Sequence, residues 1–384
     1  MIKIIPYFNL PQKDEIFNLY LYLAANAMPF FPEDIFYEGF FFPDGKEKRN
    51  IADYNRQPRR RTKNYKNILN SYNIHDGNTV KEKKKADALL AEEIIKKSSE
   101  ELHNFLYNGM IGGHINPDNL RTLLTASVGH DALQKFSFFP ITLKEKQSKD
   151  LLEHVFRYEV FSKQKGIYRL IMLMGVEVCP YCNRLFITTV AEKGKMIRPQ
   201  LDHYRSKSKY PFLALSIMNL VPSCSVCNHT KGNDLREILY PYEDEMGSRC
   251  SFRIESKSDI TVLTGTRFDD NELTIQLVQN DTASLLGQRI KESIDLLKLS
   301  ELYQSHKGYV SDLLLQKYVF TDEMIKDIAN SLPDLFDNET EVKEMLIMGK
   351  LDQERWGTRP LGKLTHDISK QLDDLYKKID LKTK

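Results

Sequence analysis

Two Cys-x-x-Cys pairs constrain this chain more than any other feature. The pairs are Cys179/Cys182 and Cys224/Cys227, and they account for four of the five cysteines in 384 residues. Five cysteines are too few for a disulfide scaffold in a chain of this length, and this paired spacing is typical of a metal site. Two thiolate pairs can surround one Zn²⁺ ion with four sulfur ligands. The sequence therefore predicts a structural zinc site that ties the ends of a module together and leaves Cys250 outside it.

Length and composition place the whole chain among globular proteins. A chain of 384 residues is long for one hydrophobic core, so two or three domains are expected. Apolar residues make up 41% and charged residues 28%, which excludes a mostly disordered chain. The absence of a long apolar run or a signal-peptide pattern predicts a cytoplasmic protein with no membrane contact. The formal net charge is only +2, so any surface that binds nucleic acid must be local.

The apolar periodicity divides the chain into three parts. Residues 1–165 read as mostly helical, with the longest amphipathic pattern over 81–107. Residues 170–240 contain the cysteine pairs and most of the polar chemistry. Residues 245–384 begin with β-rich patches over 251–278 and continue as amphipathic helices. The expected fold class is α+β: a mostly helical chain around a central zinc-bound module, followed by a small antiparallel β patch and more helices.

Two stretches near the N-terminus could contact a partner. The segment 29–43 is rich in phenylalanine, which indicates either core or a docking surface. The segment 56–66 has six basic residues and no acidic one, so it could lie along phosphates or form a solvated loop. The N-terminal region is therefore predicted to dock a partner or DNA.

The segment between the cysteine pairs, together with the residue after the second pair, carries side chains suited to phosphodiester hydrolysis. Asp202 and His203 are adjacent, and Asn219 and Asn228 follow. A neutral histidine can take a proton from water. Carboxylate and amide oxygens suit Mg²⁺ or Mn²⁺ better than Zn²⁺. A base beside such a metal ion is what this reaction requires, because the ion stabilises the developing charge while the base activates water.

The cysteines and these polar residues together resemble the HNH endonucleases. The resemblance is dense over residues 176–236, and it looks most like the members that accompany ATPases or reverse transcriptases in bacterial antiphage systems such as Septu and some retrons. It implies a ββα-metal module, in which two strands and a helix are held by zinc. The motifs that carry the resemblance are Cys179-Pro180-Tyr181-Cys182, Leu201-Asp202-His203-Tyr204, Lys207-Ser208-Lys209-Tyr210-Pro211, Asn219-Leu220, Cys224-Ser225-Val226-Cys227-Asn228 and Lys231-Gly232.

The resemblance also implies a role for each polar residue of the module. His203 would be the general base at the end of a strand, and Asp202 and Asn228 would be the Mg²⁺ ligands. Asn219 would hold the loop and help to orient the histidine. His229, one residue after Asn228, is the alternative ligand, although a carbonyl oxygen suits Mg²⁺ better.

The local charge favours a phosphate partner. Residues 195–236 contain seven basic residues and two acidic ones. The candidates for contact with the nucleic-acid backbone are Lys207, Lys209, Lys231 and Arg205. For Lys207 and Lys209, a solvated loop is the alternative. Phosphate contacts position a duplex without reading its sequence, so little sequence specificity is expected.

The prediction is a Mg²⁺-dependent HNH endonuclease that hydrolyses DNA as the nuclease effector of a bacterial antiphage system. The resemblance implies an ATPase partner, and a homo-oligomer is possible. Two alternatives stay open: a non-catalytic zinc module that docks nucleic acid or protein, and a ribonuclease acting on RNA or tRNA.

Overall fold

The fold is mostly helical, with small antiparallel sheets of two strands each. In the computed structural model, the described residues are 2–5, 9–30, 34, 60, 62–110, 112–130, 132, 134, 150–192, 196–256, 273–349 and 351–383. Most of the phenylalanine-rich segment 29–43 and part of the basic segment 56–66 lie outside these residues. The docking roles of both segments therefore stay predictions, as does the division of the chain at about residues 165 and 245.

The described N-terminal part consists of helices, of which α3 (Lys63–Ser71), α4 (Val80–Ser98), α5 (Glu100–Tyr107) and α6 (Pro117–Thr125) begin at a residue whose side chain caps the helix. The amphipathic pattern over 81–107 forms two helices, because Ser99 ends one and caps the next by accepting a hydrogen bond from the Leu102 amide at 3.2 Å. A capping box of Thr79 and Glu82 starts the first of these two helices. The other described helices of this part are α1 (Lys13–Ala27), α8 (Tyr158–Ser162) and α9 (Gly166–Met174).

Among the described residues of the central part are two small antiparallel strand pairs and a short helix. Strands β1 (Val190–Ala191) and β2 (Met196–Ile197) form the first hairpin. Strands β3 (Gln200–His203) and β4 (Leu220–Ser223) form the second, and helix α10 (Ser225–Lys231) follows β4 directly and packs back on β3.

The C-terminal part begins with the third sheet. Strands β5 (Cys250–Ser256) and β6 (Leu273–Gln279) pair antiparallel, which confirms the predicted β patch. The helices that follow are α12 (Leu285–Leu296), α13 (Leu299–Tyr303), α14 (Lys307–Val319), α15 (Asp322–Ser331), α16 (Glu339–Leu346) and α17 (Gly362–Thr383).

Helix α17 covers the edge of β5 that β6 leaves free. Asp367 accepts a hydrogen bond from the Phe252 amide at 2.9 Å, and Gln371 accepts one from the Ile254 amide at 2.9 Å. These side chains satisfy backbone donors that would otherwise need a third strand. The contact explains how a sheet of only two strands is stable in this position.

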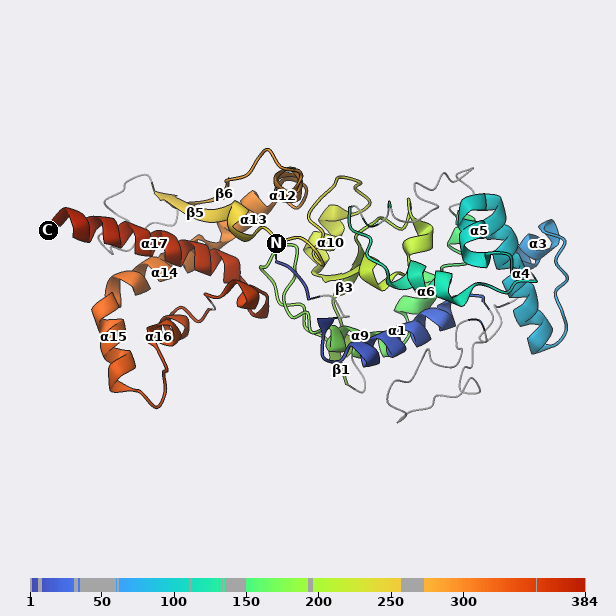
Figure 1. The fold of residues 1–384 in the computed structure, drawn as a ribbon, viewed down its shortest axis with the longest axis horizontal. Helices are drawn as coiled ribbons and strands as arrows, with labels where there is room; N and C mark the ends of the chain where they lie inside the picture. Colours follow the sequence, from blue (N-terminus) through green and yellow to red (C-terminus); the bar gives the residue numbers. More distant parts are fainter. Residues whose placement is uncertain are drawn as a thin grey trace.

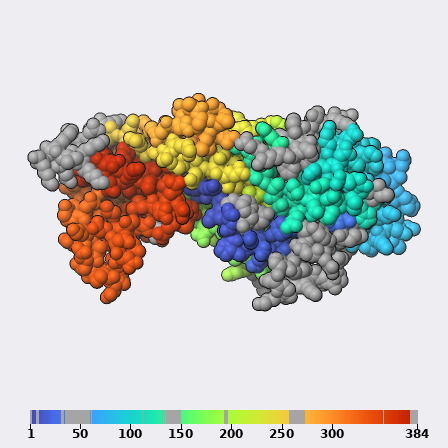
Figure 2. Space-filling view, in the orientation of Figure 1, coloured from blue at the N-terminus to red at the C-terminus, as the bar shows by residue number. Residues whose placement is uncertain are grey.

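The three parts follow one another along the long axis of the molecule, with the central module in the middle (Figure 1). Helices α14 to α16 project away from this module as an arm (Figure 2). One continuous buried core runs through all three parts, from Ile4 to Leu372. No helix in the described part of the chain has the length and apolar character needed to cross a bilayer.

Candidate functional site

The four paired cysteines come together, as the sequence predicts. Their sulfur atoms lie within 4.8 Å of one another, and all four side chains are buried. Four sulfurs around one Zn²⁺ at about 2.3 Å would be about 3.8 Å apart, so the cluster suits zinc. Backbone amides also donate to three of the sulfurs, each at 3.4 Å: Cys224 to Cys179, Cys227 to Cys224, and Arg184 to Cys182. Such donors stabilise sulfur in its thiolate form.

The pKa values of the four thiols move in opposite directions because the thiols share hydrogen bonds. Burial raises the pKa of Cys179, and hydrogen bonds from the other thiols raise that of Cys227. Hydrogen bonds within the cluster lower the pKa values of Cys182 and Cys224. A Zn²⁺ ion would supply the positive charge that lets all four bind as thiolates. Cys250 lies outside the cluster, and burial raises the pKa of its thiol to about 11.

The second hairpin and α10 form a strand–strand–helix unit beside the cysteines. In the hairpin register, Asp202 faces Val221 and His203 faces Leu220. Cys224 follows β4 and caps α10, since its sulfur accepts from the amide at the third helical position. The cysteine cluster thereby fixes the direction in which α10 leaves the hairpin. This direction brings the end of α10 back to Asp202 and His203.

His203 is held as a neutral base. Its Nε2 lies 3.0 Å from the carbonyl oxygen of Ala214. A carbonyl can only accept, so Nε2 carries the hydrogen and Nδ1 keeps a lone pair. Burial lowers the pKa of His203 to about 4; the Ala214 hydrogen bond opposes this shift and the positive charge of Lys207 adds to it. The ring of Tyr158 packs edge-on against the imidazole, with 4.4 Å between ring centroids. At neutral pH the imidazole is therefore neutral, with its hydrogen on Nε2 and a lone pair on Nδ1.

Asn219 holds the loop that carries the Ala214 carbonyl. Its side chain is fully buried. It accepts from the Arg205 amide at 2.7 Å and donates to the Arg205 and Leu213 carbonyls, both at 3.0 Å. Since Leu213 precedes Ala214, these bonds fix the acceptor of His203. The placement agrees with a loop-holding role for Asn219.

Asp202 is buried and bound on two sides. Only 3% of the residue is exposed. The Tyr181 hydroxyl donates to Oδ2 at 2.6 Å, and the Lys231 ammonium lies 3.2 Å from Oδ1 and 3.1 Å from Oδ2. Burial raises the pKa of this carboxyl, while Lys231 and Tyr181 act in the opposite direction. Asp202 thus already holds one cation, and it sits beside the base.

The two candidate ligands on α10 differ in exposure. Asn228 is half-buried and lies one turn before Lys231, on the same face of the helix. His229 is exposed. The position of Asn228 therefore suits a shared site with Asp202 better than that of His229 does.

The four basic candidates are placed differently. Lys207 lies near the site, with its ammonium 5.6 Å from the centroid of the Tyr158 ring, and Lys209 is exposed. Lys231 is buried against Asp202, and Arg205 is bound to the Val128 carbonyl at 3.1 Å and to Glu237 at 2.6 Å. Lys207 and Lys209 each lie over an aromatic ring, whereas Lys231 and Arg205 would first have to leave their carboxylate partners to contact a phosphate.

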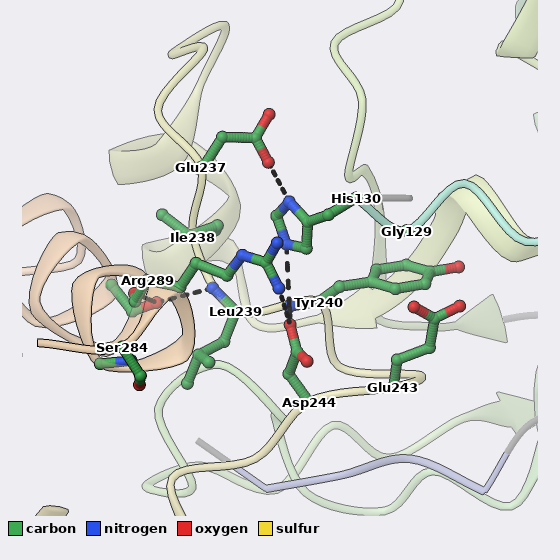
Figure 3. A network of polar contacts seen from close by, with 12 residues as sticks. Gly129, His130, Glu237, Ile238, Leu239, Tyr240, Glu243, Asp244, Ser284 and Arg289 are labelled. Carbon is green, nitrogen blue, oxygen red and sulfur yellow. Dashed lines mark hydrogen bonds and ion pairs between the residues drawn. The ribbon is translucent and has the colours of Figure 1, made fainter. Parts of the chain in front are cut away.

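Arg205 also borders a polar network that the sequence analysis did not identify. His130 lies between two carboxylates: Nδ1 contacts Glu237, and Nε2 is 3.6 Å from Asp244 (Figure 3). The Tyr204 hydroxyl is 3.1 Å from the same Nε2. Burial favours the neutral imidazole, but Asp244 and Glu237 outweigh it, so the pKa of His130 is raised. Through His130, the network joins the N-terminal part to the module and to the chain just after it.

Three further residues at the site have weak or no sequence signals. Tyr181 and Asn183 lie in and directly after the first cysteine pair, so the motif itself marks them. Tyr158 comes from a helix outside the module, and nothing in its sequence context indicates that it contacts His203.

Comparison with protein-family models, with curated proteins and with solved structures finds no match to this chain. Similarity therefore identifies no family. The class that the structure supports is a mostly helical protein with a buried four-cysteine cluster suited to structural zinc.

Proposed function

We propose that the chain is a Mg²⁺-dependent endonuclease of the HNH type that hydrolyses DNA. One observation carries the proposal: the Nε2 of His203 is bound to a fixed carbonyl, which leaves Nδ1 as a base in the strand–strand–helix unit. The neighbouring side chains suit a hard divalent ion, since Asp202 offers carboxylate oxygens and Asn228 an amide oxygen. Asp202 already binds the cation of Lys231, which supports its capacity to hold positive charge at this position.

The residues of the chain would share the work of hydrolysis. His203 accepts a proton at Nδ1 from the attacking water, and its Nε2 hydrogen bond keeps the ring in place. Asn219 maintains that geometry through the loop. Asp202 and Asn228 would hold the Mg²⁺ ion, which when bound supplies positive charge to the developing phosphorane. Lys207 and Lys209 would contact the backbone phosphates of the substrate.

The biological setting rests on the resemblance to nucleases of antiphage systems. In that setting the chain would be the nuclease effector in the cytoplasm, and an ATPase would be its partner. One module of this kind cuts one strand, so a double-strand break would need two copies or two events.

The test is plasmid nicking by the purified full chain with Mg²⁺ or with EDTA. We expect nicking with Mg²⁺ alone, and its loss in His203→Ala. His75→Ala, an exposed histidine far along the chain from the module, serves as the matched control and should nick as the wild type does. If His203→Ala nicks as fast as the wild type, the base is misassigned.

The same assay separates the alternatives. If the chain binds the plasmid but never nicks it, even with its partner present, a non-catalytic zinc module that docks nucleic acid is the better description. A parallel reaction on tRNA would show cleavage of tRNA and not of plasmid if the enzyme is a ribonuclease.

A further inference from the structure

Lys231 is an unusual residue for a predicted contact with nucleic acid, because its charge is buried. Its side chain is 2% exposed, and it is the last residue of α10. The ammonium has three hydrogens and contacts three oxygens: Oδ1 and Oδ2 of Asp202, and the His203 carbonyl at 2.7 Å. The side chain is therefore fully satisfied where it lies.

Asp202 needs this ammonium whenever no other cation is present. A carboxylate that is 97% buried carries a large desolvation cost unless a positive charge offsets it. The Tyr181 hydroxyl contributes a hydrogen bond but no charge. Removing one member of a buried ion pair is much more costly than removing both. Lys231 therefore stabilises the metal-free form of the site.

A divalent ion and the ammonium compete for the same oxygens. The Lys231 nitrogen is within 3.2 Å of both Asp202 oxygens. Any metal ion bound to either oxygen would be only a few ångströms from that nitrogen, where two like charges in a buried site repel strongly. The two Asp202 oxygens can therefore bind either the Lys231 ammonium in its present place or the metal ion, but not both.

We propose that Lys231 is an internal cation that occupies the metal position of the resting site and is displaced when the metal ion binds. The inference rests on the proposed function, and it assigns Lys231 a regulatory role there. Metal binding releases the ammonium beside His203, where a substrate phosphate is expected. The predicted contact of Lys231 with nucleic acid is then made only by the metal-loaded form, so the chain holds its substrate less firmly before it is competent to cut.

The first test measures Mn²⁺ binding to the zinc-loaded full chain. The electron paramagnetic resonance signal of free Mn²⁺ reports how much of the ion stays unbound. Lys231→Met should bind Mn²⁺ more tightly than the wild type by about tenfold or more, because the competing cation is gone. Without Mn²⁺, the zinc-loaded Lys231→Met protein should unfold at a lower temperature than the wild type. Added Mn²⁺ should raise its unfolding temperature by more than it raises that of the wild type. Asp202→Asn in the same background should restore the metal-free stability and abolish the tight binding.

The second test uses the unmodified sequence, so it holds even if Lys231→Met does not fold. Reductive methylation with mass spectrometry reports how accessible each lysine is. Methylation of Lys231 should be slow without metal and should rise several-fold with Mn²⁺, whereas Lys291, exposed on α12, should react equally in both conditions.

The outcomes separate this inference from the proposed function. The displacement of Lys231 is wrong if the wild type nicks DNA with Mn²⁺ while Lys231 stays protected from methylation. It is also wrong if Lys231→Met binds Mn²⁺ no more tightly than the wild type does. In both cases the proposed nuclease function is retained. If no variant binds Mn²⁺ and none nicks, the metal site itself is wrong and the displacement is overturned with it.

Discussion

Replacing Asn183 with alanine should loosen the start of α17 from the turn of the first cysteine pair. Asn183 directly follows Cys182 and is buried, with 1% of its surface exposed. Its side chain donates to the Trp356 carbonyl at 3.0 Å and accepts from the Lys363 amide at 3.0 Å. Its φ is +52°, in the left-handed region that asparagine tolerates better than alanine.

These contacts set the size of the effect. The two hydrogen bonds at 3.0 Å are lost, together with a longer one to the Arg359 carbonyl at 3.5 Å. Leaving their backbone partners unpaired in the interior costs about 2 to 3 kcal/mol. Alanine at a positive φ adds about 1 kcal/mol, a cost that glycine does not have. We therefore expect Asn183→Ala to lower the free energy of unfolding by about 3 to 4 kcal/mol. The decrease caused by Asn183→Gly should be smaller than this by about 1 kcal/mol.

The assay is urea unfolding of the zinc-loaded chain, combined with amide hydrogen exchange. Exchange should increase most in the first turns of α17, whereas the remote helix α4 should be unaffected. Zinc content must stay at the wild-type level, so that the loss is not caused by loss of metal. The reasoning is refuted if Asn183→Ala costs less than about 1 kcal/mol, or if glycine is no better than alanine.

Two other predictions concern metal and pH. Metal analysis should find about one zinc per chain; Cys224→Ser should lower the zinc content and unfold the module, whereas Cys250→Ser should leave the zinc content unchanged. The pKa of His130 is raised by folding, so its contribution to stability is present below its ordinary value of about 6.5 and is lost as the pH rises through the higher folded value. Urea unfolding between about pH 6 and 9 should show this loss in the wild type and not in His130→Gln.

The sequence predicts best those features that depend on short spacing. The two cysteine pairs define the metal cluster because each pair is a local turn, and the turn fixes the sulfurs with little help from the rest of the fold. Asn219 binds the backbone of a loop that begins only a few residues after His203, so its contacts also depend on short spacing. The helical character of the flanks follows from periodicity in the same way.

The sequence cannot predict contacts made across long separations, or the exposure of a charge. Tyr158 against His203, and α17 against β5, depend on how distant segments pack. Lys231 illustrates the second limit. A lysine at the end of a short helix normally indicates a solvated surface, and only the position of Asp202 on the neighbouring strand makes it a buried ion pair.

The turn of the first cysteine pair is the point at which the three parts of the chain meet. The Ile2 amide donates to the Pro180 carbonyl at 3.0 Å, and the Tyr303 hydroxyl donates to the Cys182 carbonyl at 2.6 Å. Tyr181, between them, binds Asp202. The backbone of one short turn thus binds the N-terminus and the C-terminal helices, while its central side chain reaches the proposed metal ligand. A zinc ion that fixes this turn would therefore set the geometry of the site and of both flanks at once, because each contact needs the turn in one conformation.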